Sequence, residues 1–400
     1  MFTIQGKYNT AFCYAEIIEQ EAIDQITRML NYDFTAGSRI YIMPDVHAGK
    51  GCTIGTTMTI KDKVVPNIVG VDIGCGMYTV HLGTEMPDLS RVDEAAHYIP
   101  SGMNVWDVPQ ETFDLKQLRC YDALKNVPRL NNSLGTLGGG NHFIEIDHSE
   151  NGNYYLVIHS GSRNLGVQVA NYYQNKAIDL HSHKEEYMQK REELIRQYKA
   201  EGRSKEIQEA LNTLQYSIPE LTLPEDLCYV YSKTMDDYLH DIEICQQFAV
   251  HSRQRMAKII LEYTGITPGE AFHTIHNYID IHEMVLRKGA ISAHKGEKII
   301  IPVNMKDGCI IAVGKGNPEW NESAPHGAGR LMSRSAAKAR ISMNDYISSM
   351  EGIYTTTVNT STLDEAPMAY KPLEAILNTI SDTAEVIEVM KPIYNFKAGE

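Results

Sequence analysis

Short β-rich runs bounded by Gly-dense turns recur in three stretches of the chain that lie far apart in sequence. They fall at residues 38–82, 134–163 and 271–316, and the first stretch contains SRIYIM, NIVGVDI and MYTVHL. Such runs predict strands, and glycine-rich connections at strand ends are typical of loops that hold a site. The chain therefore needs a β-rich core whose loops carry the chemistry.

Helical patterns occupy the spaces between these stretches. Residues 184–214 are highly charged, place Ile207, Leu211 and Leu214 at i, i+4, i+7 spacing, and contain Gly202 in the middle. This pattern predicts two helices that project as a hairpin with solvated outer faces. Residues 236–263 predict another long amphipathic helix, which ends at Gly265.

The length of the chain suits either two to three average domains or one large mixed domain. Of its 400 residues, 43% are hydrophobic and 22% are charged. This composition excludes a largely disordered, collagenous or coiled-coil product. We therefore expect an α+β fold in a single large mixed domain over residues 1–400, with a helical insertion at residues 184–220.

The net charge limits how the protein can meet nucleic acid. Lys and Arg number 37 against 51 Asp and Glu, so the balance is 37 − 51 = −14. A chain this acidic repels polyanions as a whole. Any RNA must therefore be bound along a local basic path.

The sequence also predicts the compartment. No basic leader precedes an apolar core at the N-terminus, and no apolar run approaches the roughly 20 residues needed to cross a bilayer. The seven cysteines are scattered and never in CxxC spacing, which favours neither a disulfide framework nor a zinc ribbon. We expect a cytoplasmic protein with reduced thiols and no membrane partner.

Four histidines stand at predicted strand ends or in Gly-rich loops. His142 follows Gly138 to Asn141, His159 precedes SGSR, His276 precedes Asn277, and His326 opens HGAGR. One such histidine is more often a hydrogen-bonded structural residue than a ligand. Four of them together weaken that interpretation and point to a shared site.

A carboxylate and a thiol add to this set. Asp72 and Cys75 lie three residues apart in the Gly-rich segment VGVDIGCGM. Three imidazoles, a thiolate and a carboxylate exceed the needs of one tetrahedral ion, so a two-metal cluster with a bridging thiolate is chemically reasonable. Ligand softness alone favours zinc or iron over manganese. A buried Cys75 and a turn-stabilising Asp72 remain the simpler alternatives.

The HGAGR segment suggests a phosphate site. It leads into LMSRSAAKAR, which predicts a helix bearing Arg330, Arg334, Lys338 and Arg340. A Gly-rich entry to a helix exposes backbone N–H groups that suit a phosphate. With His326 at its first position, the segment allows a neutral imidazole to attack a phosphorus atom.

Several ordered segments resemble those of RtcB, the 3′-phosphate RNA-splicing ligase family, in a bacterial-type variant. They are PDVHAGKG, GVDIGCG, LGGGNHFIE, HSGSR, HNYID, PHGAGR, DEAPMAYK and the late Lys397, and they run from about Tyr41 to the C-terminus. The resemblance implies a single domain of the RtcB type, with a β-rich core that holds a dinuclear metal site and with peripheral helices.

The resemblance also implies an activity. Members of the family are GTP-dependent, manganese-requiring ligases that join RNA ending in a 3′-phosphate or 2′,3′-cyclic phosphate to RNA beginning with a 5′-hydroxyl. The reaction would pass through a histidine–GMP intermediate and an activated RNA–ppG end, in RNA repair or tRNA splicing. An activator protein would be a further partner.

The resemblance assigns roles to individual residues. Two Mn²⁺ ions would be bound by Asp72, Cys75, His142, His159 and His276, with Cys75 as the bridge. His326 would be the nucleophile that becomes guanylylated, and His47 and Lys50 are candidates for touching RNA phosphate. The guanine nucleotide would contact Asn141, His142, Phe143, Ile144, Glu145, His276, Asn277, Pro302, Asn304, Met305, Cys309, His326, Gly327, Ala328, Gly329, Tyr370 and Lys397.

One of these contacts has a clear chemical basis. A carboxylate at Glu145 can accept hydrogen bonds from the guanine N1–H and exocyclic amine, which adenine does not offer in that arrangement. Glu145 is therefore expected to select guanine.

One segment departs from the family pattern. The chain has Pro302-Val303-Asn304-Met305-Lys306-Asp307-Gly308-Cys309 where most members carry Pro-Gly-Ser-Met-Gly or a close relative. Lys306 is either a compensating charge or a solvated loop lysine. The residues after Lys397 also overrun the usual Lys-Gly ending.

Two other classes of function stay open at this point. A dinuclear metallohydrolase would open cyclic phosphates or cleave phosphodiesters at RNA ends without GTP. A non-catalytic RNA-end-binding protein would tolerate the loss of His326, although a full set of ligands is hard to explain in a passive binder.

Overall fold

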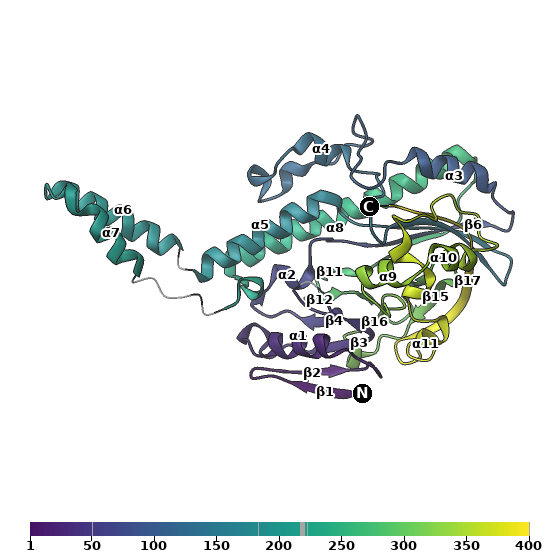
Figure 1. The fold of residues 1–400 in the computed structure, drawn as a ribbon, viewed down its shortest axis with the longest axis horizontal. Coiled ribbons are helices and arrows are strands. Elements are labelled where there is room, and N and C mark those ends of the chain that lie inside the picture. Colours follow the sequence, from purple (N-terminus) through teal and green to yellow (C-terminus); the bar gives the residue numbers. More distant parts are fainter. Residues whose placement is uncertain (50, 183, 217–220, 222, 400) are drawn as a thin grey trace.

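Two β-sheets make up the centre of the protein, and both draw strands from distant parts of the chain (Figure 1). The computed structural model describes all residues except 50, 183, 217–220, 222 and 400. Helices lie around the sheets, and one pair of helices extends away from the body. The expected α+β class is confirmed.

The first sheet has six strands and is antiparallel apart from one parallel pair, β2 with β3. In spatial order the strands are β1 (Phe2–Gln5), β2 (Thr10–Cys13), β3 (Ile40–His47), β4 (Ile54–Thr59), β12 (Val285–Lys288) and β11 (Asn277–Asp280).

The second sheet has seven antiparallel strands and curls so that its two edges approach each other. In spatial order the strands are β10 (Ala271–Ile275), β6 (Gly76–Gly83), β8 (Tyr154–Ser160), β7 (Phe143–Ser149), β17 (Ala384–Lys397), β15 (Gly308–Gly314) and β14 (Lys298–Asn304). The Ile300 N–H of one edge strand donates to the Thr274 hydroxyl of the other at 3.1 Å. The sheet is therefore nearly closed.

Two short ladders complete the β structure described. β13 (Ala290–Ser292) pairs with β16 (Ser323–Pro325), and β5 (Lys63–Val64) pairs with β9 (Val230–Tyr231). The first of these ladders brings the segment that carries His326 next to the six-stranded sheet, because β16 ends one residue before it.

The described helices flank both sheets. They are α1 (Gln20–Leu30), α2 (Pro66–Val69), α3 (Leu89–Tyr98), α4 (Val127–Asn132), α5 (Arg163–His181), α6 (Lys184–Ala200), α7 (Ile207–Tyr216), α8 (Ser232–Thr264), α9 (Arg334–Arg340), α10 (Met343–Ser349) and α11 (Leu373–Leu377). α8 ends at Gly265, whose φ of 74° lies in the left-handed region that favours glycine.

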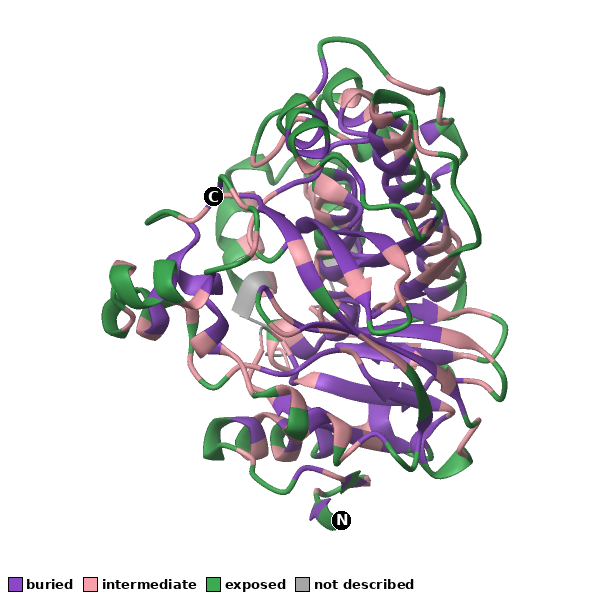
Figure 2. Ribbon diagram, turned by 90° about the vertical axis from the view of Figure 1, so that its right-hand side faces the viewer, coloured by how far each residue is buried: buried purple, intermediate pink, exposed green. Residues whose placement is uncertain are grey.

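Apolar packing joins the helices to the sheets. The largest buried cluster combines residues of the six-stranded sheet, such as Ile40 and Leu286, with Val169 of α5 and Phe248 of α8. Figure 2 shows buried residues concentrated in the strands and on the inward sides of the helices. α8 therefore forms a rigid backing for the strand ends of both sheets.

Most of the predicted elements are present, with one correction. The long helix and the two helices around Gly202 are observed, and the hairpin of α6 and α7 projects from the body in Figure 1. The last residues of the expected insertion, 217–220, lie outside the described part. The predicted strand NIVGVDI is wrong, because Pro66 begins the one-turn helix α2 and Gly70 ends it with a φ of 94°.

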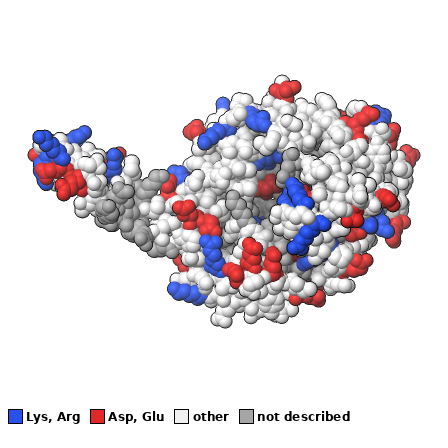
Figure 3. Space-filling view, viewed as in Figure 1, with Lys and Arg blue, Asp and Glu red and all other residues white. Residues whose placement is uncertain are grey.

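The surface carries both signs of charge. Figure 3 shows Lys and Arg interspersed with Asp and Glu over the face in view and on the projecting hairpin. Among the described residues, no helix has the length and apolar character that spanning a membrane would require.

Candidate functional site

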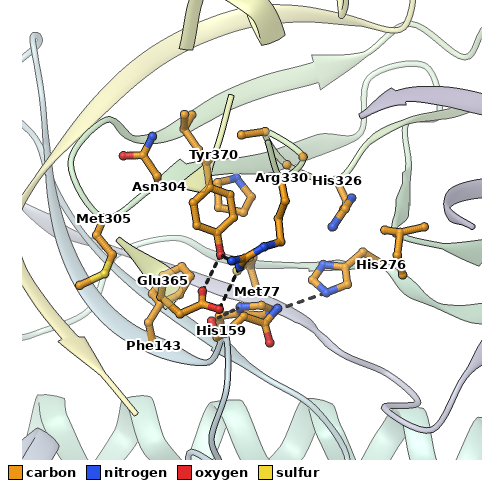
Figure 4. Close-up of a pocket in the computed structure, with 18 of the residues that line it drawn as sticks. Met77, Phe143, His159, His276, Asn304, Met305, His326, Arg330, Glu365 and Tyr370 are labelled. Carbon is orange, nitrogen blue, oxygen red and sulfur yellow. Dashed lines mark hydrogen bonds and ion pairs between the residues drawn. The ribbon is translucent and has the colours of Figure 1, made fainter. Parts of the chain in front are cut away.

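A cavity of about 280 Å³ opens where the two sheets face each other. His47 and Ile54 reach it from the six-stranded sheet, and Phe143 and Glu145 reach it from the seven-stranded sheet. The loops after β14 and β16 close its remaining sides. Figure 4 shows His276 and His326 toward one side of this cavity, with Arg330, Glu365 and Tyr370 grouped beside them.

Five side chains with metal-ligating atoms gather beside this cavity. We call them the lone-pair cluster, and they are Asp72, Cys75, His142, His159 and His276. They come from the turn before β6, from the starts of β7 and β11, and from the end of β8. The structure thus brings together all five predicted metal ligands.

The distances within the lone-pair cluster are short. The Cys75 Sγ lies 3.5 Å from the His142 Nε2 and 3.2 Å from the His159 Nε2. The His159 Nε2 lies 3.3 Å from the His276 Nε2, and the His142 Nε2 lies 3.2 Å from the Asp72 Oδ2. The five ligating atoms therefore form a continuous chain of contacts, and those of Cys75, His142 and His159 all lie within 4.8 Å of one another.

Backbone contacts decide which imidazole nitrogens face the other members of the lone-pair cluster. The His142 Nδ1 lies 2.9 Å from the Leu137 carbonyl, and the His159 Nδ1 lies 3.1 Å from the Asn141 carbonyl. A carbonyl only accepts, so each Nδ1 carries the proton and each Nε2 presents a lone pair to the cluster. Cys75 has one S–H, which can satisfy only one of these two lone pairs.

Burial sets the charges of the lone-pair cluster. It lowers the pKa of His159 and His276 well below the usual range, so both imidazoles are neutral. It raises the pKa of the Cys75 thiol, which the nearby Asp72 charge raises further.

This donor set fits divalent metal ions. Unsatisfied imidazole lone pairs, an ionised carboxylate and a thiol that a cation would deprotonate are the ligands of transition-metal sites. The cluster lacks positive charge of its own at the point where these atoms meet. The residues present therefore suit a metal centre on chemical grounds.

A glycine allows the carboxylate to reach the cluster. A Cβ atom at Gly161 would lie 1.9 Å from the Asp72 Oδ1. Only glycine leaves room for that contact in the loop after β8. This explains the HSGSR segment in physical terms, because its glycine faces a predicted metal ligand.

Arg253 supports the cluster from behind. This side chain of α8 is fully buried, and its Nη1 donates to the Gly74 carbonyl at 2.8 Å and to the Ser160 carbonyl at 2.6 Å. One guanidinium thus ties the turn that holds Cys75 to the strand end that holds His159. Sequence analysis missed this role, because nothing in a helical pattern marks one arginine as buried.

Asp45 orients His326. The His326 Nδ1 lies 2.7 Å from the Asp45 Oδ2, which also accepts the His326 backbone N–H at 3.2 Å. The imidazole ring lies 5.0 Å from that of His276 between centroids. Because the Nδ1–H group donates to Asp45, the Nε2 lone pair is free to act as a nucleophile. Sequence analysis selected the segment PDVHAGKG but not its aspartate, which lies 281 residues from His326.

The predicted helical phosphate cradle is wrong. α9 begins at Arg334 with Ser333 as its N-cap, so the loop from Gly327 to Gly329 does not enter a helix directly. The Leu331 N–H instead donates to the Ala369 carbonyl at 2.8 Å. Pairing with that segment holds residues 330–331 in an extended conformation and delays the start of the helix.

A second polar cluster lies beside the cavity, and we call it the ion-pair hub. It consists of two buried carboxylates and the basic side chains around them: Asp364, Glu365, Arg330, Arg334, Lys338 and Lys397. Glu365 is 2% exposed and contacts Arg330 at 3.2 Å and Lys397 at 3.1 Å. The Tyr370 hydroxyl donates to it at 2.5 Å.

These partners keep Glu365 ionised. Burial alone would raise the pKa of Glu365, but Lys397, Arg334, the Tyr370 hydroxyl and Arg330 lower it to about 2. Sequence analysis included Glu365 in the DEAPMAYK segment without giving it a role. Its partners come from three separate segments, which only the fold brings together.

Most of the predicted nucleotide contacts line the cavity. Those that do are Asn141, Phe143, Glu145, His276, Asn277, Pro302, Asn304, Met305, His326, Gly327, Ala328, Gly329, Tyr370 and Lys397. Three others do not, because His142 belongs to the lone-pair cluster while Ile144 and Cys309 are fully buried in apolar clusters. Of the two candidate RNA contacts, His47 lines the cavity and Lys50 lies outside the described residues.

The departing segment after β14 folds on itself. The Asn304 Oδ1 accepts the backbone N–H groups of Lys306 and Asp307, both at 2.9 Å, and its Nδ2 donates to the Asp307 carboxylate at 2.8 Å. This is an Asx turn, in which the side chain stabilises its own loop. Asn304 therefore shapes the cavity wall, while Lys306 is exposed.

Comparisons with known proteins give a consistent result. A family model described as tRNA-splicing ligase RtcB matches residues 25–398. The chain is 32% identical to the RNA-splicing ligase RtcB of Escherichia coli (strain K12), over 94% of each protein. It is 26% identical to RNA-splicing ligase RtcB2 of Escherichia coli (strain ATCC 25922), over 95% of this chain and 93% of the relative. The tRNA-splicing ligase RtcB of Aeropyrum pernix is 25% identical over 84% of this chain and 82% of its own length.

Proposed function

This chain belongs to the RtcB family of tRNA-splicing ligases, and on that premise we propose that it is a GTP-dependent RNA ligase. It would join RNA ending in a 3′-phosphate or 2′,3′-cyclic phosphate to RNA beginning with a 5′-hydroxyl, in RNA repair or tRNA splicing. One observation carries the proposal: the imidazole of His326, held by Asp45 at 2.7 Å, lies beside the lone-pair cluster in one cavity.

The first step we propose is guanylylation of His326. Its Nε2 attacks the α-phosphorus of GTP, an N–P bond forms, and the P–O bond to pyrophosphate breaks. The Nδ1 proton stays on the imidazole and is held by the Asp45 carboxylate, which stabilises the positive charge of the product ring. Asp45 thus acts as the orienting partner of the nucleophile.

The second and third steps transfer and release GMP. A cyclic phosphate end is first opened by water to a 3′-phosphate. An oxygen of that phosphate attacks the histidine-bound phosphorus, which breaks the N–P bond and yields an RNA–ppG end. The 5′-hydroxyl of the second RNA then attacks the RNA phosphate, and GMP leaves.

We propose that Asp72, Cys75, His142, His159 and His276 would hold two Mn²⁺ ions. When bound, such ions neutralise the charge that develops on phosphate oxygens. The tautomers of His142 and His159, fixed by backbone carbonyls, favour this assignment.

The chain's own residues would bind the base and the phosphates. Glu145 faces the cavity as the predicted guanine partner, and Lys397 and Tyr370 lie beside it. Arg330, Arg334 and Lys338 form a local basic path along which RNA would bind, although the net charge of −14 repels RNA from the protein as a whole. Binding of RNA should therefore weaken steeply with salt.

We also propose the remaining expectations of the family. The ligase domain would span residues 1–400 with residues 184–220 as an insertion, and the protein would act in the cytoplasm. The projecting helices α6 and α7 extend away from the two sheets in Figure 1, and none of their described residues lines the cavity, so these helices would not take part in the chemistry.

The decisive experiment is incubation with Mn²⁺ and α-labelled GTP, followed by denaturing electrophoresis. We expect an acid-labile label on the wild type and none on His326→Ala. His240→Ala is the matched control, because His240 lies on α8 outside the cavity lining, with its Nε2 at 3.0 Å from the Gln117 carbonyl. Asp45→Asn should slow labelling by about 100-fold or more, as expected when an orienting carboxylate is lost.

Absence of label with every divalent metal would contradict the proposal. Metal-dependent release of RNA products without nucleotide would then favour the dinuclear metallohydrolase. Label on His326→Ala equal to the wild type would show that another residue is the nucleophile.

A further inference from the structure

A third buried cluster lies behind the base-binding end of the cavity. Glu145 and Asp147 are two residues apart on β7, so their side chains share one face of the sheet. Cys309 reaches the same place from β15. An oxygen of each carboxylate and the Cys309 Sγ lie within 4.8 Å of one another, and all three residues are at most 2% exposed.

The hydrogen bonds of this cluster are incomplete. The Glu145 Oε2 accepts from the Asn395 Nδ2 at 2.5 Å, and the Cys309 thiol donates weakly to the Glu145 Oε1 at 3.7 Å. Neither oxygen of Asp147 accepts a hydrogen bond from any described residue, although Asp147 is fully buried. A buried carboxylate without donors is costly in its ionised form.

The neighbouring cation does not compensate the cost of burying ionised carboxylates here. The charge of Lys397 on β17 favours ionisation of Glu145. The Lys397 ammonium, however, already contacts Glu365 at 3.1 Å and the Asn141 carbonyl at 2.9 Å. Tyr155, opposite Asp147 on β8, donates its hydroxyl to Glu388 at 2.7 Å instead. From β15 the facing group is the Cys309 thiol, and from β17 it is the neutral Asn395 amide.

One proton held by this carboxyl pair would relieve the cost. It gives the orphaned Asp147 oxygens a donor, and it removes one of two like charges from an apolar environment. Burial raises the pKa of both groups, and the charge of Asp147 raises the pKa of Glu145 further. The pair then holds one proton over a range of pH in which an exposed carboxyl is fully ionised.

The protonation state of Glu145 determines which purine base its carboxyl group can bind. An ionised carboxylate accepts from the guanine N1–H and 2-amino group, but it faces the bare N1 lone pair of adenine. A carboxylic acid donates to that adenine N1 and loses one acceptor position for guanine. The base preference of the cavity therefore depends on where the shared proton lies.

We propose that Asp147 is a specificity-determining residue, which sets through a proton shared with Glu145 how strongly the cavity prefers guanine over adenine. This inference rests on the proposed function, because it assumes that Glu145 binds the purine base. Asp147 does not line the cavity, so it acts through Glu145 as a positioning and charge-setting partner.

The test measures the ratio of affinities for GMP and AMP in the presence of Mn²⁺. Neither nucleotide can guanylylate His326, and contributions from phosphate and metal cancel in the ratio. For the wild type we expect the preference for GMP to rise by about tenfold or more from about pH 6 to about pH 8, as the pair loses its proton.

The variant Asp147→Asn removes the like charge and supplies an amide donor to Glu145. Its preference for GMP should be high already at low pH and should not change with pH. Asp93→Asn is the matched control, because Asp93 is also buried but accepts from Thr356 and Tyr394, away from the cavity. The control should follow the wild-type profile.

Each outcome decides the question. A wild-type ratio that does not change with pH overturns the inference even if Asp147→Asn fails to fold. An Asp147→Asn ratio that follows the wild-type profile overturns it as well. In both cases GMP binding itself would leave the proposed function standing, whereas no GMP binding at any pH would overturn the proposed function and this inference together.

Discussion

The lone-pair cluster and the ion-pair hub adjoin the same cavity, but they solve the burial of polar groups in opposite ways. The hub surrounds two carboxylates with basic side chains, so that Glu365 alone has four donors. The lone-pair cluster brings acceptors together, with Nε2 atoms 3.3 Å apart in His159 and His276. The hub is satisfied within the chain, whereas the lone-pair cluster has a donor set that suits cations from solution.

This difference predicts what each cluster contributes to the stability of the fold and to metal binding. The hub pairs its buried carboxylates within the chain and so stabilises the fold, and removing one partner leaves a buried charge without compensation. The lone-pair cluster contributes binding free energy to its ligand and little to the metal-free fold. Substitutions in the two clusters should therefore separate stability from metal affinity.

The largest effect is expected for Cys75→Ala. The thiol lies against two imidazoles, so its loss removes the ligand that can bridge two ions. We expect Mn²⁺ affinity to fall by more than about 100-fold, exceeding the effect of losing a supporting residue. Titration followed by electron paramagnetic resonance measures this directly.

The control for Cys75→Ala is Cys228→Ala, because Cys228 is equally buried but lies in the core next to Val230. It should bind Mn²⁺ like the wild type. Equal affinities in the two variants would show that the lone-pair cluster is not the metal centre, and the comparison of the clusters would fail.

The next effect is a loss of stability in Glu365→Gln. Removing the charge leaves the half-buried Arg330 and the buried Lys397 without their carboxylate. We expect the free energy of unfolding to fall by about 3 kcal/mol, with Mn²⁺ affinity little changed. Urea denaturation measures the first quantity, and Glu351→Gln, on an exposed residue, is the control.

The pH dependence of the hub follows from the same carboxylate. The pKa of Glu365 is lowered in the folded protein from 4.5 to about 2. Its contribution to stability is therefore fully present above pH 4.5 and is lost as pH falls toward 2. The difference in unfolding free energy between wild type and Glu365→Gln should shrink over this range, and a constant difference would contradict the assigned ionisation.

The sequence predicted which side chains gather in the lone-pair cluster better than it predicted their supports. Histidines beside glycines at strand ends are visible as a pattern, and so is the end of α8 at Gly265. Asp45 and Arg253 were missed because their roles depend on partners that are distant in sequence, such as the Gly74 carbonyl 179 residues away.

Local conformation was predicted least well where turns and partners compete with periodicity. The apolar run NIVGVDI has the composition of a buried strand, but Pro66, directly before the run, starts a helical turn that includes its first three residues. The helix expected after HGAGR starts late, because Leu331 pairs with Ala369. In both cases one tertiary or turn contact outweighed the pattern.

The smallest effect is expected for Arg253→Lys, and it sharpens the comparison by separating charge from geometry. Burial lowers the pKa of Arg253 to about 10, so it is a cation at neutral pH, and the substitution keeps a basic side chain at this place. Arginine spans the Gly74 and Ser160 carbonyls, whereas a single ammonium on a flexible stem cannot hold both with the same geometry. If the lone-pair cluster needs this support, Mn²⁺ affinity should fall by about tenfold, the lower end for a supporting residue. Unchanged affinity in a folded Arg253→Lys protein would mean that the ligands are positioned by their own strands and backbone carbonyls alone.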